Sequence, residues 1–352
     1  MRNANDKVLV GGRVTALGAP AGAVTQKKPI PFNCELVSIA FALSAPPSLP
    51  ATLEVYVNDV DTGIVFNYPA SGTSHTLYPD ARVYLNEGDV LHLRSGGESV
   101  SSPAADVSYV LRNNGNEQIM NGDTITAMQT ATTQSELKVV PYDCEILGLA
   151  VGLSANLSTP TTLEVFLDQV TTGIDFTAPS GTTTPGLLRP ATKVFAKKGV
   201  TLNVKTGGET TGTPIGFFTW LLRPMQSIPL GRYFLEIPGT FNLTAASDSE
   251  GVVAPDKADV VEMVLRPFGA VAASPANGCF LGLKLNEEAS ATGVQYHLEE
   301  GATAPALLPV LNRAHEYVEP ADRIRINLLG ENIGSAGTVG TLILDSVGDT
   351  AR

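Results

Sequence analysis

The chain has 352 residues, of which 16% are charged and 6% aromatic, and its formal net charge is −12. A charged fraction well below the usual quarter or so, with many Gly, Pro, Ser and Thr residues, is typical of hydroxyl-rich all-β proteins. Binding to a nucleic-acid backbone needs clustered Lys and Arg that release counterions, so the acidic balance argues against a nucleic-acid partner. No apolar stretch approaches the length of a membrane span.

One module is repeated along the chain. The segment CELVSIAFALS at 34–44 returns at 144–154 as CEILGLAVGLS, and TLEVY at 52–56 returns at 162–166 as TLEVF. A period of roughly 20 to 50 residues would indicate a solenoid, whose units cannot fold alone. Here the period is about 110 to 120 residues, which is the usual size of one domain. The sequence therefore predicts three domains in tandem, each with its own core.

Two further anchors hold the register of the repeats. One is a Thr-Gly turn at Gly63, Gly173 and, more faintly, Gly293. The other runs from an aromatic residue through a turn into an alternating strand, at 84–98, 195–209 and 317–331. In two repeats this line ends in Gly-Gly-Glu, which we interpret as a turn between strands because Gly tolerates positive φ.

The predicted boundaries lie near Asn114 and Gly231, which gives domains at 1–114, 115–231 and 232–352. Both linkers are short and neither is a Gly/Ser tether, so we expect the domains to pack in a fixed arrangement. The third unit departs from the others, because it lacks the Cys-Glu start and has an apparent insertion at 255–259.

Alternation of apolar and polar residues is the dominant local pattern. It is clear at 53–57, 90–94 and 201–205, and it predicts strands with one buried face. Turn formers separate these segments at the spacing expected of sandwiches. The best helical candidate, 316–324, is interrupted by Pro320 and matches strands in the other repeats. We predict an all-β fold of three tandem antiparallel β-sandwich domains, jelly-roll-like, each with about eight strands.

Several residues are predicted to have structural roles. The three cysteines, Cys34, Cys144 and Cys279, are too few for a disulfide scaffold and are expected to be buried and reduced. The Lys27-Lys28 and Lys197-Lys198 pairs are interpreted as solvated strand ends.

No constellation of residues indicates catalysis or a metal site. The four histidines form no His-x-His pair, and His92, between Leu91 and Leu93, is expected to face solvent. The best calcium candidate is 58–63 (NDVDTG), because alternating carboxylates before a Gly can wrap a cation, but a polar hairpin turn explains the same residues. We therefore predict no catalytic residue, no metal and no cofactor.

The repeated core combines a Cys-Glu start, an apolar strand ending in Leu-Ser, a Pro-rich loop, Leu-Glu-Val-Tyr/Phe and a Thr-Gly turn. In this pattern of repeated segments, the chain resembles jelly-roll virion structural proteins of tailed bacteriophages. These include head-decoration (cement) proteins, head fibres and tail-attached proteins. The resemblance is strongest across 30–112 and 140–223 and weak across 258–345. It carries over no site residue, because the matching positions are core and turn positions.

The resemblance implies a non-enzymatic virion protein, a homo-oligomer that decorates or projects from a capsid and contacts capsid or tail subunits. The alternative is a carbohydrate-binding adhesin that recognises host surface glycans through exposed aromatics. However, Tyr56, Phe66, Phe166, Phe176 and Phe217 fall where core packing is expected. An enzyme of the cupin or glycosidase type is a third option.

The first residues of the chain bear on location and contact. They contain no hydrophobic signal region, so we expect synthesis in a host cytoplasm and residence in the virion. The segment 1–8 precedes the first expected strand and has no counterpart in the second repeat. We therefore predict that Arg2, Asn3 and Lys7 contribute to an interface with the particle.

Overall fold

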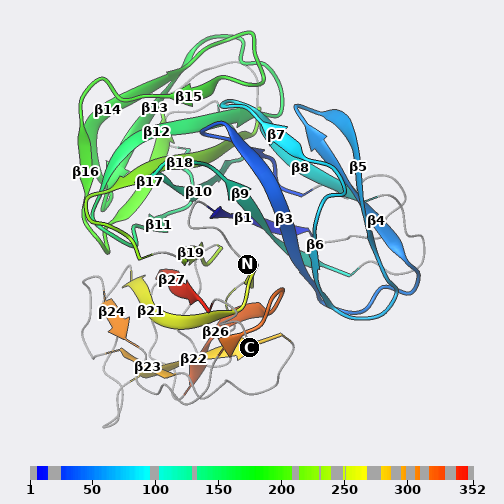
Figure 1. Cartoon of the computed structure of the whole chain (residues 1–352). Coiled ribbons are helices and arrows are strands. Elements are labelled where there is room, and N and C mark those ends of the chain that lie inside the picture. Colours follow the sequence, from blue (N-terminus) through cyan, green and yellow to red (C-terminus); the bar gives the residue numbers. More distant parts are fainter. Residues whose placement is uncertain are drawn as a thin grey trace.

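The computed structural model describes thirteen segments of the chain, and within them the regular elements are strands (Figure 1). These segments are 6–14, 25–95, 103–128, 133–207, 214–229, 231–238, 249, 251–267, 279–286, 295–298, 306–309, 317–329 and 338–347. The predicted Gly-Gly-Glu turns, apart from Gly207, lie outside the described residues, as does His315.

The first repeat is a sandwich of two antiparallel sheets. Its first sheet has the order β1-β9-β3-β6 with β7 also paired to β3, and its second sheet has the order β2-β8-β4-β5. The strands are β1 (Asp6–Val14), β2 (Lys28–Pro29), β3 (Cys34–Leu43), β4 (Ala51–Val57), β5 (Val60–Tyr68), β6 (Ser74–Leu77), β7 (Val83–Leu85), β8 (Val90–Ser95) and β9 (Ala105–Arg112).

The second repeat has the same two sheets, ordered β10-β18-β12-β15, with β16 on β12, and β11-β17-β13-β14. Its strands are β10 (Gln118–Ile125), β11 (Lys138–Val139), β12 (Cys144–Leu153), β13 (Thr161–Leu167), β14 (Val170–Ala178), β15 (Gly186–Leu188), β16 (Val194–Ala196), β17 (Thr201–Thr206) and β18 (Gly216–Pro224).

The third repeat follows the same order again, as β19-β27-β21-β24, with β25 on β21, and β20-β26-β22-β23. Its strands are β19 (Arg232–Glu236), β20 (Val252–Val253), β21 (Ala258–Pro267), β22 (Cys279–Leu285), β23 (Gln295–Leu298), β24 (Ala306–Pro309), β25 (Tyr317–Val318), β26 (Arg323–Leu329) and β27 (Thr338–Ser346). In each repeat the first strand pairs with the last and the second with the next to last, which is the wrapping of a jelly roll. The predicted fold class is confirmed.

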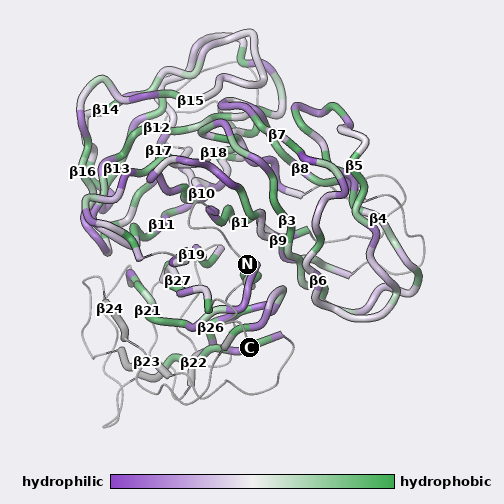
Figure 2. Tube along the Cα trace, viewed as in Figure 1, coloured by the Kyte–Doolittle hydropathy of each residue, from purple (hydrophilic) through white to green (hydrophobic). Residues whose placement is uncertain are grey.

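Each sandwich encloses its own core, as the alternation predicted. In β4, Leu53 and Val55 are buried, and their equivalents in β13, Leu163 and Val165, are fully buried in the second core. In Figure 2, hydrophobic segments run along strands that line the cores, for instance β1 and β21. Cys34 and Cys144 begin equivalent strands and are free and buried, as expected, whereas the side chain of Cys279 lies outside the described residues.

The turn after the fourth strand of each repeat contains the same hydrogen bond. Its first residue has a positive φ, which Asn and Asp tolerate better than most residues do. These residues are Asn58 (φ 54°), Asp168 (φ 48°) and Asn286 (φ 52°). Their side-chain Oδ1 atoms accept from the backbone N–H groups of Val90 (2.8 Å), Thr201 (2.9 Å) and Arg323 (3.0 Å), respectively. The predicted hairpin turn is therefore confirmed at Asn58 and Asp59, where the Asn58 side chain holds it.

The predicted Thr-Gly turn is wrong, because Gly63 (φ 73°) and Gly173 (φ 68°) lie inside β5 and β14, at register shifts in the pairing with β4 and β13. Gly293 lies outside the described residues.

The prediction of an insertion in the third repeat is wrong. Ala258 pairs with Val318 as Cys34 pairs with Leu85 and Cys144 with Ala196. Ala258 therefore replaces the cysteine with no change in spacing from the preceding short strand. Sequence comparison alone missed this because few side chains at 255–259 resemble those of the other repeats.

Candidate functional site: the junction of the three repeats

The three sandwiches are arranged in a closed ring. The short strand β2 of the first repeat packs on β12 and β18 of the second, β11 of the second packs on β21 and β27 of the third, and β20 of the third packs on β3 and β9 of the first. The first strands β1, β10 and β19 contact one another at the centre of the ring (Figure 1). The chain therefore has an internal pseudo-threefold axis, and the fixed packing expected from the short linkers is seen.

A residue with a hydroxyl side chain occupies the equivalent position in each of the three interfaces. Ser108 Oγ donates to the carbonyl of Val253 (2.8 Å), and Thr341 Oγ1 donates to the carbonyl of Val139 (2.9 Å). Thr219 occupies the third equivalent position, on a strand packed against β2, although its hydroxyl has no hydrogen-bond partner among the described residues. Two interfaces are thus fixed by the same bond, and the third has the same residue type without it.

An apolar side chain from each first strand packs away from its own core. Val8 joins the core cluster of the third repeat, Ile119 joins that of the first, and Phe234 packs with Val139 of the second. These three residues occupy the same repeat position. In each first strand, the residue two places further along the chain pairs with the interface hydroxyl residue, which is Ser108, Thr219 or Thr341. Burial of such side chains is the main favourable contribution to the ring.

A buried cluster of charged and amide groups lies between the first two repeats. Lys28, at 1% exposure, donates from Nζ to Asn121 Oδ1 (2.8 Å) and to the amide oxygen of Gln26. Lys138, at the equivalent position of the second repeat, is also buried, and its Nζ lies 2.8 Å from Asp123 Oδ2 and 3.2 Å from Glu136 Oε2. The expectation that Lys28 is a solvated strand end is wrong, because the neighbouring repeat covers it.

Glu236, on β19 of the third repeat, brings a third chain segment to this cluster. It is 1% exposed, and its carboxylate interacts with its own backbone and with that of Asn121. Burial raises the pKa of Glu236 to about 7, while nearby backbone groups and the ammonium groups of Lys138 and Lys28 oppose that rise.

The two lysines respond differently to burial. Desolvation lowers the pKa of Lys28 to about 7, and the attraction of Asp123 only partly offsets it. Burial also disfavours the charge of Lys138, but Asp123 and Glu136 raise its pKa above the usual value. In turn, Lys138 and Lys28 hold the pKa of Asp123 well below its ordinary range despite desolvation. Opposite charges therefore fix the protonation of Lys138, whereas Lys28 and Glu236 titrate near neutral pH.

Ion pairs bridge all three interfaces, and Arg266–Asp168 (3.4 Å) is the longer of two between the second and third repeats. The shortest pairs at the three interfaces are Arg189–Glu87 (3.1 Å), Lys198–Glu262 (2.7 Å) and Arg323–Asp106 (2.5 Å). The first is exposed, the second is half-buried and the third is almost completely buried. Because exposed pairs contribute little and breaking a buried pair is costly, the third pair is the one that matters for stability.

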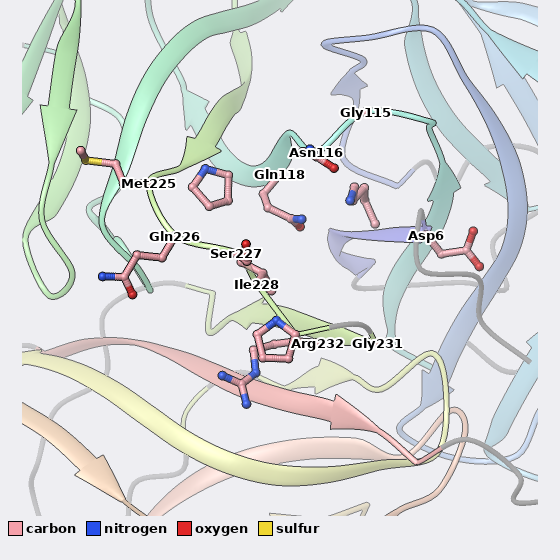
Figure 3. Close-up of a pocket in the computed structure, with 13 residues that line it drawn as sticks. Asp6, Gly115, Asn116, Gln118, Met225, Gln226, Ser227, Ile228, Gly231 and Arg232 are labelled. Atoms are coloured by element: carbon pink, nitrogen blue, oxygen red, sulfur yellow. The ribbon is translucent and has the colours of Figure 1, made fainter.

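A pocket of about 460 Å³ opens at one end of the pseudo-threefold axis, where the first strands begin (Figure 3). Its lining includes Asp6 and Lys7 of β1, Gln118 of β10, and Gly231 and Arg232 beside β19. The lining is polar, and the pocket lies between segments of all three repeats.

The residues predicted for an interface are placed as follows. Lys7 lies inside β1, is 5% exposed and lines this pocket, while Arg2 and Asn3 lie outside the described residues. The premise that 1–8 precedes the first strand and lacks a counterpart is wrong. The first strand begins at Asp6, and β10 is its counterpart in the second repeat.

His92 does not face solvent. It is 0% exposed, its ring stacks on Tyr56 at 5.3 Å, and its Nε2 atom lies 3.6 Å from Asp59 Oδ1. Neither ring nitrogen has a hydrogen-bond partner among the described residues, and burial lowers the pKa of His92 to about 4. Alternation within a strand identifies the face opposite the core, but it cannot show whether other chain segments cover that face.

Three of the five aromatics expected in the cores lie elsewhere. Phe66 and Phe176 are in the cores, whereas Phe217 is buried outside the core clusters, on the face of β18 opposite Phe218. Tyr56 and Phe166 lie half-buried on the outer faces of their sheets. There Arg94 lies 4.2 Å above the Tyr56 ring, and Lys205 lies 4.0 Å above the Phe166 ring. The same aromatic and cation pair is thus repeated on two outer faces.

Within the described ranges, no group of three His, Cys, Asp or Glu side chains is arranged to hold a metal ion. In the same ranges, no helix has the length and apolarity that a membrane crossing requires. In the candidate calcium turn, Asp59 binds Lys27 (2.6 Å) and Asp61 accepts from the backbone N–H of Gly63 (2.8 Å). The side chains of that turn are therefore engaged within the protein.

Similarity between this chain and known proteins is distant. No protein-family model matches the chain, and no curated protein matches it. Among solved structures, one described as the triple jelly-roll fold and turret assembly in an archaeal virus is 10% identical, with a TM-score of 0.21, covering 97% of this chain and 89% of that one. A second, from the atomic structure of Sulfolobus turreted icosahedral virus, is 10% identical, with a TM-score of 0.20, covering 95% and 84%.

Proposed function

We propose that this protein is a non-enzymatic structural component of a virion, and that it acts as a capsid decoration protein of the kind carried by tailed bacteriophages. The observation that carries the proposal is the ring of three covalently linked jelly rolls. A block with internal threefold pseudo-symmetry presents nearly the same surface in three directions. It therefore fits a threefold position in a shell, where each repeat meets an equivalent capsid subunit.

The interior of the ring supports a structural role. The junction is built from apolar contacts, paired charges and hydroxyl bonds that fix the repeats to one another. Such a junction resists deformation because packed interiors transmit strain rather than yielding to it. A component made in a host cytoplasm and seated on a particle requires this rigidity.

Particles that lack the protein test the proposal. They should assemble normally yet rupture at a lower temperature or under milder osmotic shock than complete particles do. Electron microscopy of both preparations should show the missing density at a threefold position. Unchanged particle strength together with unchanged density would contradict the decoration role.

A tail- or head-attached adhesin that binds host glycans is the second candidate, favoured by the outer-face pairs Tyr56–Arg94 and Phe166–Lys205. Aromatic rings beside polar groups can stack on sugars. In that case, removal of the protein should spare particle strength and abolish adsorption to cells. Replacing Tyr56 and Phe166 together with Ser should then abolish adsorption as well.

Contact with the particle through Arg2, Asn3 and Lys7 is also part of the proposal. Because Asp6 and Lys7 belong to β1, a truncation must stop before them if the first sheet is to stay intact. Deleting residues 1–4 should weaken binding to particles without changing the unfolding midpoint. Full retention of binding would exclude Arg2 and Asn3 from the contact.

We further propose that each predicted domain folds as a unit. A fragment of residues 116–231 should be soluble and unfold cooperatively, because its core and its Lys138, Asp123 and Glu136 cluster are internal to it. It should be less stable than the same repeat in the full chain by about 3 to 6 kcal/mol, since Ile119 and Leu221 lose their cover. Circular dichroism during urea unfolding measures this, and an aggregated or non-cooperative product would count against the boundaries.

A further inference from the structure

A row of side chains crosses the first sheet of each repeat at the same level. In the first repeat, Tyr84 is paired with Glu35, Glu35 with Arg112, and Arg112 with Asp6. The second repeat has Phe195, Glu145, Arg223 and Glu117, and the third has Tyr317, Asp259, Asp345 and Arg232. Each row runs from an aromatic position on the outer part of the sheet to the pocket on the pseudo-threefold axis, which Asp6 and Arg232 line. We call these three rows the end face.

The aromatic residues of the end face are exposed. Tyr84 is 65% and Phe195 is 53% exposed, and the side chain of Tyr317 lies outside the described residues. Met225, which lines the pocket at the centre of this face, is also exposed (Figure 3). Single exposed apolar residues are ordinary on protein surfaces. Here, however, the same aromatic position is exposed in two repeats and has ion pairs beside it, and this combination is typical of an interface.

Charge on the end face is close to balanced, unlike the chain as a whole. The ion pairs include Arg112–Asp6 (2.8 Å), Arg223–Glu145 (3.2 Å) and Arg232–Asp345 (2.6 Å), and Arg82 and Lys193 lie within 3.8 Å of Glu35 and Glu145. The whole chain carries −12, so most other surfaces of two copies repel one another. Between two end faces the repulsion is therefore weaker than the net charge of the whole chain would suggest.

The polarity of the third row is reversed. In repeats 1 and 2 the acid stands on the first strand or directly before it and the arginine on the last strand, as Asp6 with Arg112 and Glu117 with Arg223. In repeat 3 the arginine, Arg232, stands on the first strand and the acid, Asp345, on the last. When two copies face each other across a two-fold axis, repeat 1 of one copy can lie over repeat 3 of the other. The partly exposed Arg112 then meets Asp345 of the opposite copy, in both directions.

We propose that the end face is a self-association surface, on which a second copy of this chain stacks face to face about a two-fold axis. Equivalent positions with one polarity in every repeat would set like charges against like. The reversal in repeat 3 removes that conflict where repeat 1 lies over repeat 3, which leaves it only where repeat 2 faces repeat 2. Tyr84 and Phe195 supply the apolar anchors, which is the role that aromatic residues take in most interfaces. The inference concerns the chain in solution and does not depend on the virion role.

Sedimentation of the full-length chain over a range of concentrations tests the aromatic anchors. The wild type should form dimers, and Tyr84→Ser combined with Phe195→Ser should weaken dimerisation by at least about tenfold. The matched control is Val60→Ser combined with Val170→Ser, because these residues are equally exposed (67% and 65%) and repeat-equivalent but begin β5 and β14, away from the rows. The control should dimerise as the wild type does.

A charge swap tests the geometry. Arg232→Asp combined with Asp345→Arg keeps the ion pair within the chain but gives repeat 3 the polarity of the other two, so dimerisation should fall by at least about tenfold. Both variants should keep the wild-type unfolding midpoint. A monomeric wild type, a dimer that tolerates loss of both aromatics, or a dimer indifferent to the swap would overturn the inference. A monomer would leave the virion proposal to be decided by the particle experiment.

Discussion

Lys28 and Lys138 occupy the same position in two repeats, and comparing them shows what makes a buried charge tolerable. Lys28 is held by two amide oxygens, from Gln26 and Asn121, whereas Lys138 is held by two carboxylates, from Glu136 and Asp123. Gln26 and Glu136 stand at the same repeat position. Asn121 reaches Lys28 from the neighbouring repeat, whereas Asp123 reaches Lys138 from within its own repeat. Each ammonium group has two oxygen partners, yet the pKa of Lys28 falls to about 7 and that of Lys138 rises.

The difference shows that hydrogen bonds alone do not replace the hydration of an ammonium group. Amide dipoles satisfy the donors of Lys28, but a full opposite charge is needed to offset desolvation. The third repeat has Val252 at this position and avoids the problem. One ring position is thus filled in three ways, by an amide-bound lysine, by an ion-paired lysine and by an apolar residue.

The largest expected effect comes from breaking the paired cluster. Lys138→Met leaves Asp123 and Glu136 without their counter-ion in a buried site, so the free energy of unfolding should fall by about 3 to 5 kcal/mol. Lys28→Met at pH 6 should be neutral or raise stability by up to about 2 kcal/mol, since it removes a charge that burial already penalises. Urea unfolding of both variants measures the contrast, and equal losses would show that the two lysines are held alike.

Stability should depend on pH in two windows. Glu236 binds a proton more tightly in the folded state, with a pKa raised to about 7 from 4.5, so its contribution is present below pH 4.5 and is lost as the pH rises toward 7. Lys28 binds its proton less tightly when folded, with a pKa lowered to about 7 from 10.5, so its contribution falls as the pH drops from 10.5 toward 7. These two groups should therefore make the protein more stable, with a higher unfolding midpoint, on either side of neutral pH.

Two variants separate these windows. Glu236→Gln should flatten the profile between pH 4.5 and 7, and Asn121→Asp should flatten it between 7 and 10.5 because it gives Lys28 a carboxylate partner like that of Lys138. Midpoints of urea unfolding across the pH range report both effects. A profile for Asn121→Asp that matches the wild type would mean that Asn121 does not govern the proton affinity of Lys28.

A smaller effect is expected at the edge of the ring. Arg189→Ala removes an exposed ion pair with Glu87 and should change stability by less than about 1 kcal/mol, because solvent screens such pairs. The buried pair of Arg323 and Asp106 is the matched comparison, and Asp106→Ala should cost several times more. Thermal unfolding of the two variants ranks them, and a loss for Arg189→Ala as large as that for Asp106→Ala would reverse the assignment.

No effect is expected from chelation. Asn58 Oδ1 accepts from the backbone N–H of Val90, and Asp59 is paired with Lys27, so the candidate calcium turn is held by protein groups. EDTA should leave the melting temperature unchanged, since a ligand stabilises a protein by binding its native state. A clear fall that calcium restores would show that this turn binds a cation after all.

The sequence by itself determined the three repeats, the strand faces and the polar hairpin turns, because these depend on local spacing. Alternation places Leu163 in a core and Glu164 on the other face whatever surrounds the sandwich. The repeated lysine, 110 residues apart at Lys28 and Lys138, was also visible and could have drawn attention to the junction. The sequence contained no pattern that shows which outer faces of the sheets are covered by other repeats.

Only the tertiary structure decided that question. His92 and Tyr84 are both directed away from a core by their strand pattern, yet His92 is buried and Tyr84 is exposed. Lys28 pairs with the core residue Leu91, so it lies on the core side of β2, and it is buried although it is a lysine. The outcome depends on contacts with segments far away in sequence, such as β10 and β18 beside Lys28. A pattern of period two describes one sheet, whereas the closing of three sandwiches into a ring sets which of its outer side chains still meet water.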